Sequence, residues 1–324
     1  MFIDLRMLKG IGVVSVSLML GCATLIHAQA SRAQTALSYV ERGNEWLKKE
    51  DWERAIADFN LAIATDPRTA RAYNNRGVAR QAKGDLEGAE ADFTRALEID
   101  PRHSNAYHNR GLARHKRSDY DGAIADFTRA LELDPRYARA YSNRANARYA
   151  KGDLTGAIAD STQAIQLNSR SRLAHTTRGL ARQKRGDLSG AIADFNQAIV
   201  IDPGYVEAHL FRGTAHFDQG DLERALADYT RAIALDPNFV EAYNNRGVVY
   251  VILKNYERAL ADYDRAVLLN PLSASTFLNR GLTRLLNGQA TGAEQDFAHC
   301  LSLDQSLKPV IEQRINLAKR WMAK

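Results

Sequence analysis

The strongest constraint on the fold is a dipeptide that returns every 34 residues. It occurs at Asp66-Pro67, Asp100-Pro101, Asp134-Pro135, Asp202-Pro203 and Asp236-Pro237, and Asn270-Pro271 continues the series. Successive prolines lie 34 residues apart, or 68 where one copy has lost its proline. Eight repeats then run without insertion or deletion over residues 36–69, 70–103, 104–137, 138–171, 172–205, 206–239, 240–273 and 274–307. Such a period indicates stacked structural repeats.

Each repeat has the residues of a tight helical hairpin. Position 8 is glycine in seven repeats, position 20 is alanine in all eight, and position 24 is Phe or Tyr in seven, as in Gly77, Ala89 and Phe93. The small residues allow two antiparallel helices to approach closely, and the aromatic ring fills the gap to the neighbouring hairpin. Gly84-Asp85 between them provides a left-handed helix stop and an N-cap. A single hairpin cannot bury its apolar face alone, so stability must come from stacking.

This skeleton, with its A-x-x-x-[FY] spacing and terminal proline, resembles the tetratricopeptide repeat. The resemblance implies an all-α, right-handed superhelical solenoid of antiparallel helix pairs. It also implies a protein that binds extended or helical segments of other proteins in its concave groove. After repeat 8 the period stops. Residues 308–324 are predicted to form a capping helix, because Pro309 suits a helix start and Ile311, Ile315, Ala318 and Met322 make one apolar stripe.

Repeat 4 departs from the pattern. It carries Ala145 at position 8, Ser161 in place of the aromatic residue and Ser169 in place of the proline. Losing an aromatic side chain removes apolar contact from the core, so the array is expected to be least stable around residues 140–175. Sequence drift and a functional hinge both explain the departure.

The first 30 residues differ from everything after them and resemble an export leader. Arg6 and Lys9 precede an apolar run over residues 11–26, and Ala28-Gln29-Ala30 offers a cleavage site for signal peptidase. Three alternatives are open: a secretory signal cleaved after Ala30, a lipoprotein leader with Cys22 as the lipidated residue, or an uncleaved membrane anchor. Residues 31–35 are expected to be a short linker. All three alternatives place the repeats outside the cytoplasm, in the periplasm, secreted or tethered to a membrane.

Charge and motifs argue against the other classes of function. The net charge of +6 comes from residues of alternating sign with no long basic run, which is typical of a solvated surface and not of a nucleic-acid interface. No phosphate-loop, dinucleotide or nucleophile-elbow motif occurs. His108 and His115 share a helix face but lack a third metal ligand. We therefore expect no enzyme, no cofactor, no metal, no small-molecule substrate and no nucleic-acid partner.

Two charged positions recur in all eight repeats. Position 7 is arginine and position 23 is aspartate, and the family usually has leucine at position 7. Since every arginine comes with its own acidic residue, a structural ladder is favoured over a series of phosphate-binding arginines. The ladder is predicted for Arg76 with Asp92, Arg110 with Asp126, Arg144 with Asp160, and Arg178 with Asp194.

Asparagine at position 6 is the first candidate for a binding residue. It occurs in five repeats, as Asn75, Asn109, Asn143, Asn245 and Asn279. The resemblance implies that this position faces the groove. A similar asparagine ladder, in the repeats of the sugar transferase that modifies Ser and Thr, holds an extended peptide by its backbone. An amide both donates and accepts, which suits main-chain recognition. The alternative is a merely solvated polar stripe.

Apolar residues at groove positions of the later repeats are the second candidate. They are Phe217, Val251, Leu278, Leu282 and Leu285. A continuous apolar lining is where a partner helix or apolar tail would dock, unless it packs beneath the terminal helix. The function predicted from these features is a protein-binding scaffold or adaptor in the cell envelope. The alternative is a non-catalytic regulatory or assembly subunit of an envelope enzyme complex.

Overall fold

Every regular element between residues 29 and 322, the range described in this computed structural model, is a helix. The chain divides into two compact units, unit 1 (residues 1–151) and unit 2 (residues 152–324). Unit 1 contains a first helix over residues 29–48, then α2 (Trp52–Thr65), α3 (Ala70–Ala82), α4 (Leu86–Ile99), α5 (Ser104–Lys116), α6 (Tyr120–Leu133) and α7 (Ala138–Lys151). Unit 2 contains α8 (Leu154–Leu167), α9 (Arg172–Lys184), α10 (Leu188–Ile201), α11 (Val206–Asp218), α12 (Leu222–Leu235), α13 (Val240–Ile252), α14 (Tyr256–Leu269), α15 (Ala274–Leu286), α16 (Ala290–Leu303), the 3₁₀ turn η1 (Gln305–Leu307) and α17 (Lys308–Met322).

The helices begin and end where capping chemistry dictates. Before α4, the side chain of Asp85 accepts a hydrogen bond from the backbone N–H of Gly88, and Asp51, Asp119, Asp153, Asp187, Asp221 and Asn255 cap their helices in the same way. The residue before the cap is left-handed, with φ +87° at Gly84 but also +63° at Ser118. The tight connection thus does not require glycine in every repeat, although glycine adopts it without strain.

The turn between repeats depends on the acidic or amide residue more than on proline. The Asp100 carboxylate accepts a hydrogen bond from the backbone N–H of Arg102 at 3.0 Å. In repeat 4, which lacks the proline, Asn168 accepts from Arg170 at 3.1 Å and ends α8 in the same extended conformation. The side chain closes the turn on its own backbone, which explains why the 34-residue period survives at Ser169.

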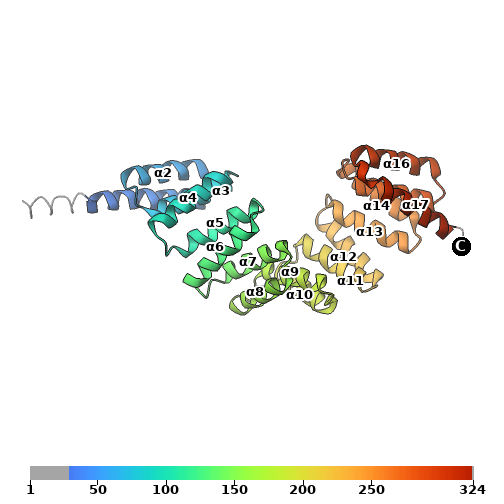
Figure 1. Cartoon of the computed structure of the whole chain (residues 1–324), viewed down its shortest axis with the longest axis horizontal. Coiled ribbons are helices and arrows are strands. Elements are labelled where there is room, and N and C mark those ends of the chain that lie inside the picture. The colour runs from blue at the N-terminus through green and yellow to red at the C-terminus, as the bar shows by residue number, and fades with distance from the viewer. Residues whose placement is uncertain (1–28, 323–324) are drawn as a thin grey trace, which may run out of the picture. The chain divides into compact units, whose positions relative to one another are not determined.

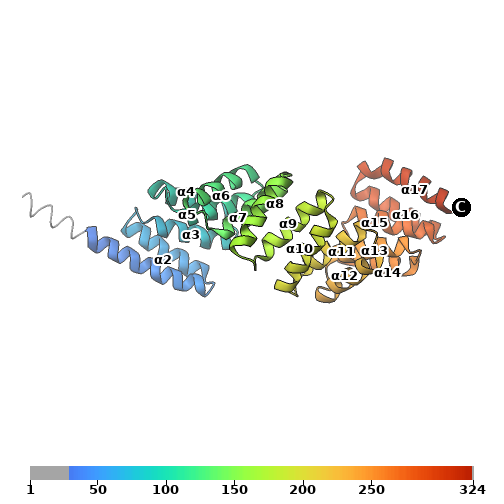
Figure 2. The same cartoon turned by 90° about the horizontal axis from the view of Figure 1, so that it is seen from below.

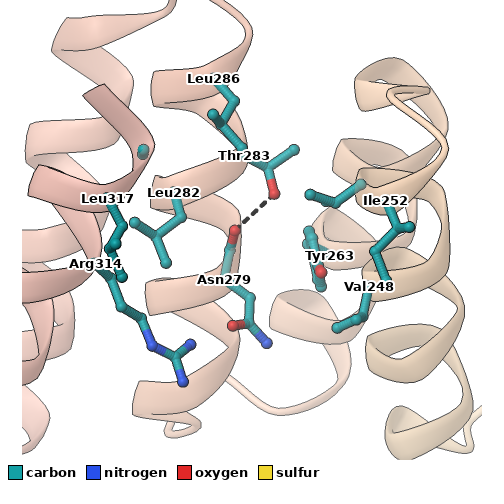
Figure 3. A pocket seen from close by; sticks show the side chains of 11 residues that line it. Val248, Ile252, Tyr263, Asn279, Leu282, Thr283, Leu286, Arg314 and Leu317 are labelled. Atoms are coloured by element: carbon teal, nitrogen blue, oxygen red, sulfur yellow. Dashed lines mark hydrogen bonds between the residues drawn. The ribbon is translucent and has the colours of Figure 1, made fainter. Parts of the chain in front are cut away.

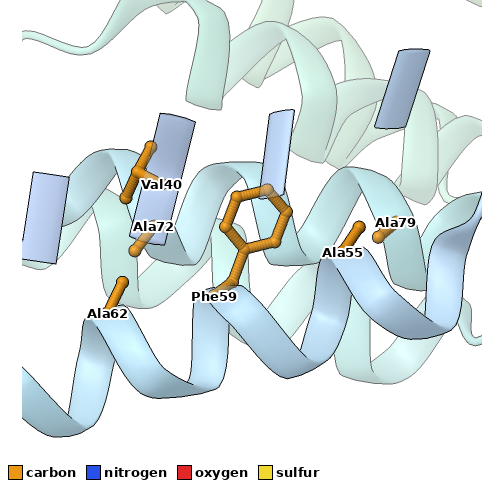
Figure 4. Packing of buried hydrophobic residues seen from close by; sticks show 6 residues of the cluster. All are labelled: Val40, Ala55, Phe59, Ala62, Ala72 and Ala79. Carbon is orange, nitrogen blue, oxygen red and sulfur yellow. The ribbon is translucent and has the colours of Figure 1, made fainter. Parts of the chain in front are cut away.

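Close helix contact forms the core of each hairpin. In repeat 1, Phe59 is fully buried among Val40, Ala55, Ala62 and Ala72 (Figure 4). A Cβ added at Gly43 would lie 2.5 Å from the Phe59 ring, and the glycine–aromatic approach recurs in repeats 2, 3, 5, 6, 7 and 8. The glycine at position 8 is therefore required because the ring occupies the space of its side chain.

Within each unit the hairpins stack in sequence order. Each helix contacts the next, and the first helices of neighbouring repeats also touch: α3 with α5 and α5 with α7 in unit 1, and α9 with α11, α11 with α13 and α13 with α15 in unit 2 (Figures 1 and 2). The predicted all-α array of antiparallel helix pairs is confirmed. The boundary between the units falls inside repeat 4, and the lower stability expected there stays a prediction.

The two ends of the array differ from a regular repeat. Helix α17 packs on α15, and Ile311 and the half-buried Ile315 join a core with Phe277 and Phe297, as expected for a capping helix. Residues 31–35, expected to be a linker, are helical and continue into residues 36–48. The leader predicted over residues 1–30 lies outside the described residues except for its last two. Within residues 29–322, no helix combines the length and apolar character that crossing a membrane demands.

Candidate peptide-binding surfaces

Arginines paired with buried aspartates form a frame that recurs through both units. Arg76 donates to Asp92 from Nε at 2.9 Å and from Nη2 at 2.6 Å, and Asp92 is buried. The same two-point pairing joins Arg110 to Asp126 and Arg178 to Asp194, as well as Arg42 to Asp58, Arg212 to Asp228, Arg246 to Asp262 and Arg280 to Asp296. Arg144 and Asp160 belong to different units, so their pairing stays a prediction.

Sequence reasoning missed a second arginine in this frame. Four residues after the first, Arg80 donates to Asp92 at 2.9 Å, and Arg114, Arg182 and Arg284 do the same for Asp126, Asp194 and Asp296. The first arginine also reaches backwards to the preceding repeat, as Arg110 does to Thr94 at 3.1 Å and Arg212 to Asn196 at 2.6 Å. Arginine at position 11 recurs in the sequence and could have been noticed.

The frame sets the electrostatics of the buried carboxylates. Burial raises the pKa of Asp194, but the His175 ring, 3.6 Å away, and the hydrogen bonds from Arg178 outweigh it and hold that pKa below its usual value. The pKa of Asp228 is lowered in the same way, by His209 and Arg212 against burial. These arginines are committed to their own chain, so they do not form an anion-binding series.

The asparagines of unit 1 are hydrogen-bonded to one another and not simply solvated. Asn75 Nδ2 donates to Asn44 Oδ1 at 2.6 Å, and Asn74 Nδ2 donates to Asn75 Oδ1 at 2.8 Å. Asn109 Nδ2 donates to Asn74 Oδ1 at 3.0 Å. We call the series Asn44, Asn75, Asn74, Asn109, His108 and Asn143 the asparagine chain. It runs along the first helices of repeats 1 to 4.

His108 continues this chain to the next repeat. Its Nε2 accepts from Asn143 Nδ2 at 2.9 Å, and its Nδ1 lies 3.4 Å from Asn109 Oδ1. Burial lowers the pKa of His108 to about 4, so the ring is neutral at pH 7, with its proton on Nδ1. Asn75, Asn109 and Asn143 are thus brought together, but part of their hydrogen-bonding capacity is already used.

Unit 2 has an open apolar pocket of about 430 Å³ on the corresponding face, between α13, α15 and α17 (Figure 3). We call this hollow the apolar pocket. It is lined by Val248, Val251, Ile252, Tyr263, Asn279, Leu282, Thr283, Leu286, Arg314, Leu317 and Ala318. The predicted residues Val251, Leu282 and Asn279 lie here. Leu317, on α17, and Ile252 remain 54% and 44% exposed, so the structure leaves apolar surface for a ligand to cover.

A smaller hollow of about 170 Å³ adjoins the apolar pocket and shares Val248 with it. The predicted residues Phe217 and Asn245 line this hollow. Leu278 and Leu285 line neither hollow. Leu278 is only 5% exposed and belongs to the apolar core that includes Phe297, and the half-buried Leu285 packs against that core, because α16 and α17 both pack on α15 or its neighbouring turn. Leu278 and Leu285 thus pack beneath the terminal helices, whereas docking of a partner at Val251 and Leu282 stays a prediction.

Comparison with known proteins supports the repeat architecture. Models of the TPR repeat match residues 113–152, 179–220 and 213–254, and models of the tetratricopeptide repeat match residues 45–107, 93–125 and 240–271. No curated protein matches the sequence.

Solved structures show the same fold at low sequence identity. A tetratricopeptide repeat protein from Parabacteroides merdae is 20% identical with a TM-score of 0.61, over 77% of this chain and 99% of its own. Cut9–Hcn1 of the APC/C hetero-tetramer is 15% identical with a TM-score of 0.64, over 86% and 54%. The pilF protein of Pseudomonas aeruginosa is 18% identical with a TM-score of 0.59, over 65% and 96%. At these identities the likeness concerns the fold alone.

Stacked antiparallel helix pairs of constant length define a helical-repeat protein. The chain belongs to the tetratricopeptide repeat family. Proteins of this family generally serve protein–protein interaction and are typically non-catalytic scaffolds.

Proposed function

We propose that this protein is a non-catalytic adaptor that binds segments of partner proteins along the first helices of its repeats. The observation that carries the proposal is the apolar pocket, which unites residues of α13, α15 and α17 and leaves Ile252 and Leu317 partly exposed. Its apolar lining with a few polar groups is typical of a binding site. No group of three or more metal-ligating side chains occurs among the described residues, and the arginines of the frame already have partners within the chain.

A single substitution in the pocket tests this function. Val248 lines both the pocket and the adjoining hollow, so Val248→Asp places a charge where a partner would bury apolar surface. Partners captured by the full chain from a cell-envelope extract should lose at least about tenfold in affinity for this variant by calorimetry. Leu272→Asp, at a site that is 76% exposed and outside the pocket, is the control. Equal affinity of both variants would exclude the pocket as the binding site of the captured partners.

We further propose that the protein acts in the cell envelope. The support is the leader pattern of residues 1–30, with Arg6 and Lys9 before an apolar run and Ala28-Gln29-Ala30 after it. Expressed in a bacterial host, the exported protein should begin at Ser31. Mass spectrometry that finds a diacylated Cys22 would select the lipoprotein alternative, and an intact Met1 in the cytosolic fraction would contradict export.

A further inference from the structure

The apolar pocket has two unlike ends. The Asn279 amide and the Arg314 guanidinium lie toward one end in Figure 3, whereas Leu286 lies toward the other. Between them, Leu282 and Leu317 face Val248 and Ile252 across the opening. A ligand that fits must therefore combine a bulky apolar group with a polar group that can reach Arg314.

Arg314 differs from the other arginines near the pocket. On α15, Arg280 and Arg284 are held by Asp296 and Asp264. Arg314 makes no ion pair with any residue that the structure describes, and none of the eleven residues lining the pocket is acidic. Arg314 is exposed at the edge of the pocket, and its guanidinium presents a planar fork of donors that matches a carboxylate.

The amides beside the pocket suit a polypeptide. Asn279 in the pocket and Asn245 in the adjoining hollow occupy the same position of neighbouring repeats. Neither side-chain amide is hydrogen-bonded to another residue within the described part of unit 2. Each can both donate to and accept from a main chain, and Val248 joins the two hollows into one path. This favours a peptide over a fatty acid, whose single carboxylate would leave the second amide unused.

We propose that unit 2 recognises a partner segment in which a bulky apolar side chain stands next to a carboxylate, the apolar group entering the apolar pocket and the carboxylate pairing with Arg314. This inference rests on the proposed function and adds the chemistry of the partner. The apolar contact provides affinity, whereas Arg314 selects against neutral and basic segments.

Selection from a displayed library of twelve random residues tests the proposal with the full chain as bait. Wild-type protein should enrich peptides with Asp or Glu beside Leu, Ile, Met or Phe. Arg314→Glu should shift the enrichment to Lys or Arg beside the same apolar residues. Arg320→Glu changes the charge of the same helix by the same amount outside the pocket, and should select like the wild type.

A chosen peptide then gives the size of the effect by fluorescence anisotropy. Arg314→Ala should weaken its binding by about tenfold or more, since a hydrogen-bonded charge is lost, and Arg320→Ala should leave it unchanged. Selected peptides without acidic enrichment, or equal behaviour of the Arg314 and Arg320 variants, would overturn the proposal. If instead no peptide is enriched above background, and calorimetry shows that decanoate binds the wild type but not Arg314→Ala, the pocket binds fatty acids and the proposal is overturned.

Failure of this inference is distinguishable from failure of the proposed function. If Val248→Asp abolishes binding of the selected peptide and Arg314→Glu does not, the pocket binds partners without reading their charge. If neither variant changes the binding of a captured partner, the partner binds elsewhere.

Discussion

The two units carry the same repeat frame but offer different faces. In unit 1, residues at position 5 such as Asn74 and His108 bond the position-6 asparagine of the next repeat. In unit 2, Leu210 holds position 5 before Asn245, so that amide has no such partner among the described residues. A polar residue at position 5 therefore satisfies the next asparagine in unit 1, whereas the apolar Leu210 leaves Asn245 available to a ligand. Asn244 is an exception, because it holds position 5 before Asn279 and yet its buried Oδ1 accepts no described hydrogen bond.

The largest effect should come from the frame that both units share. Arg110→Leu in unit 1 and Arg178→Leu in unit 2 each leave a buried aspartate short of a partner, so each should cost about 3 kcal/mol of unfolding free energy in urea titrations. Arg95→Leu, in an exposed pair with Glu98, should cost under about 1 kcal/mol. Unequal losses for the two frame variants would show that the units differ below the surface too.

A pH dependence of similar size belongs to unit 1. The folded pKa of His108 is about 4, below the unfolded value of about 6.5. The unfolded chain therefore takes up the proton first, and stability is full above pH 6.5 and falls as pH drops toward 4. The loss should approach about 3 kcal/mol. His108→Gln should remove that part of the pH dependence, and NMR titration of a His108 pKa near 6.5 would refute the assignment.

The close contact between glycine and the aromatic ring allows the role of the two units in binding to be distinguished. Gly77→Ala would place a Cβ 2.7 Å from Phe93, and Gly247→Ala 2.8 Å from Tyr263. Each should destabilise by about 1–3 kcal/mol in urea titrations. Since Tyr263 lines the apolar pocket, only Gly247→Ala should also weaken the binding of a peptide from the selection. Equal binding by both variants would show that the ring does not shape the pocket.

The smallest effect separates the asparagines themselves. Asn109→Ala removes a donor to Asn74 and should cost about 1 kcal/mol of unfolding free energy. Asn245→Ala should change it by less than about 0.5 kcal/mol. Similar losses at both positions would mean that the asparagine chain adds nothing to stability.

The period predicted the fold well because it records stacking directly. Spacing of small and aromatic residues located the hairpins, and the pair Gly84-Asp85 located the connection between two helices. The left-handed Glu50, Ser118 and Lys254 could not be read in this way, since these residues carry no marker for that conformation. Hydrogen bonds between side chains of different repeats were also beyond reach, because a period shows which positions recur and not which atoms meet.

The candidate site was only partly predictable for the same reason. Val251, Leu282 and Asn279 were found from their repeat positions, but Arg314 lies on α17, outside the repeats. Leu278 obeys the repeat pattern and yet is buried, because the last hairpin has a different neighbour. Terminal repeats are where positional reasoning fails, since their surroundings are not those of the interior copies.

The bridging arginine also bears on how such a chain can grow. Arg110 bonds Asp126 sixteen residues ahead and Thr94 sixteen residues behind, and Arg246 bonds Asp262 and Thr230 at the same offsets. A single inserted or deleted residue in either interval would move one of the two hydrogen-bond partners out of reach of the arginine. Lengthening the array by whole repeats leaves both hydrogen bonds of every such arginine intact. Gene duplication of complete 34-residue units therefore preserves these contacts, whereas a small insertion within either interval does not.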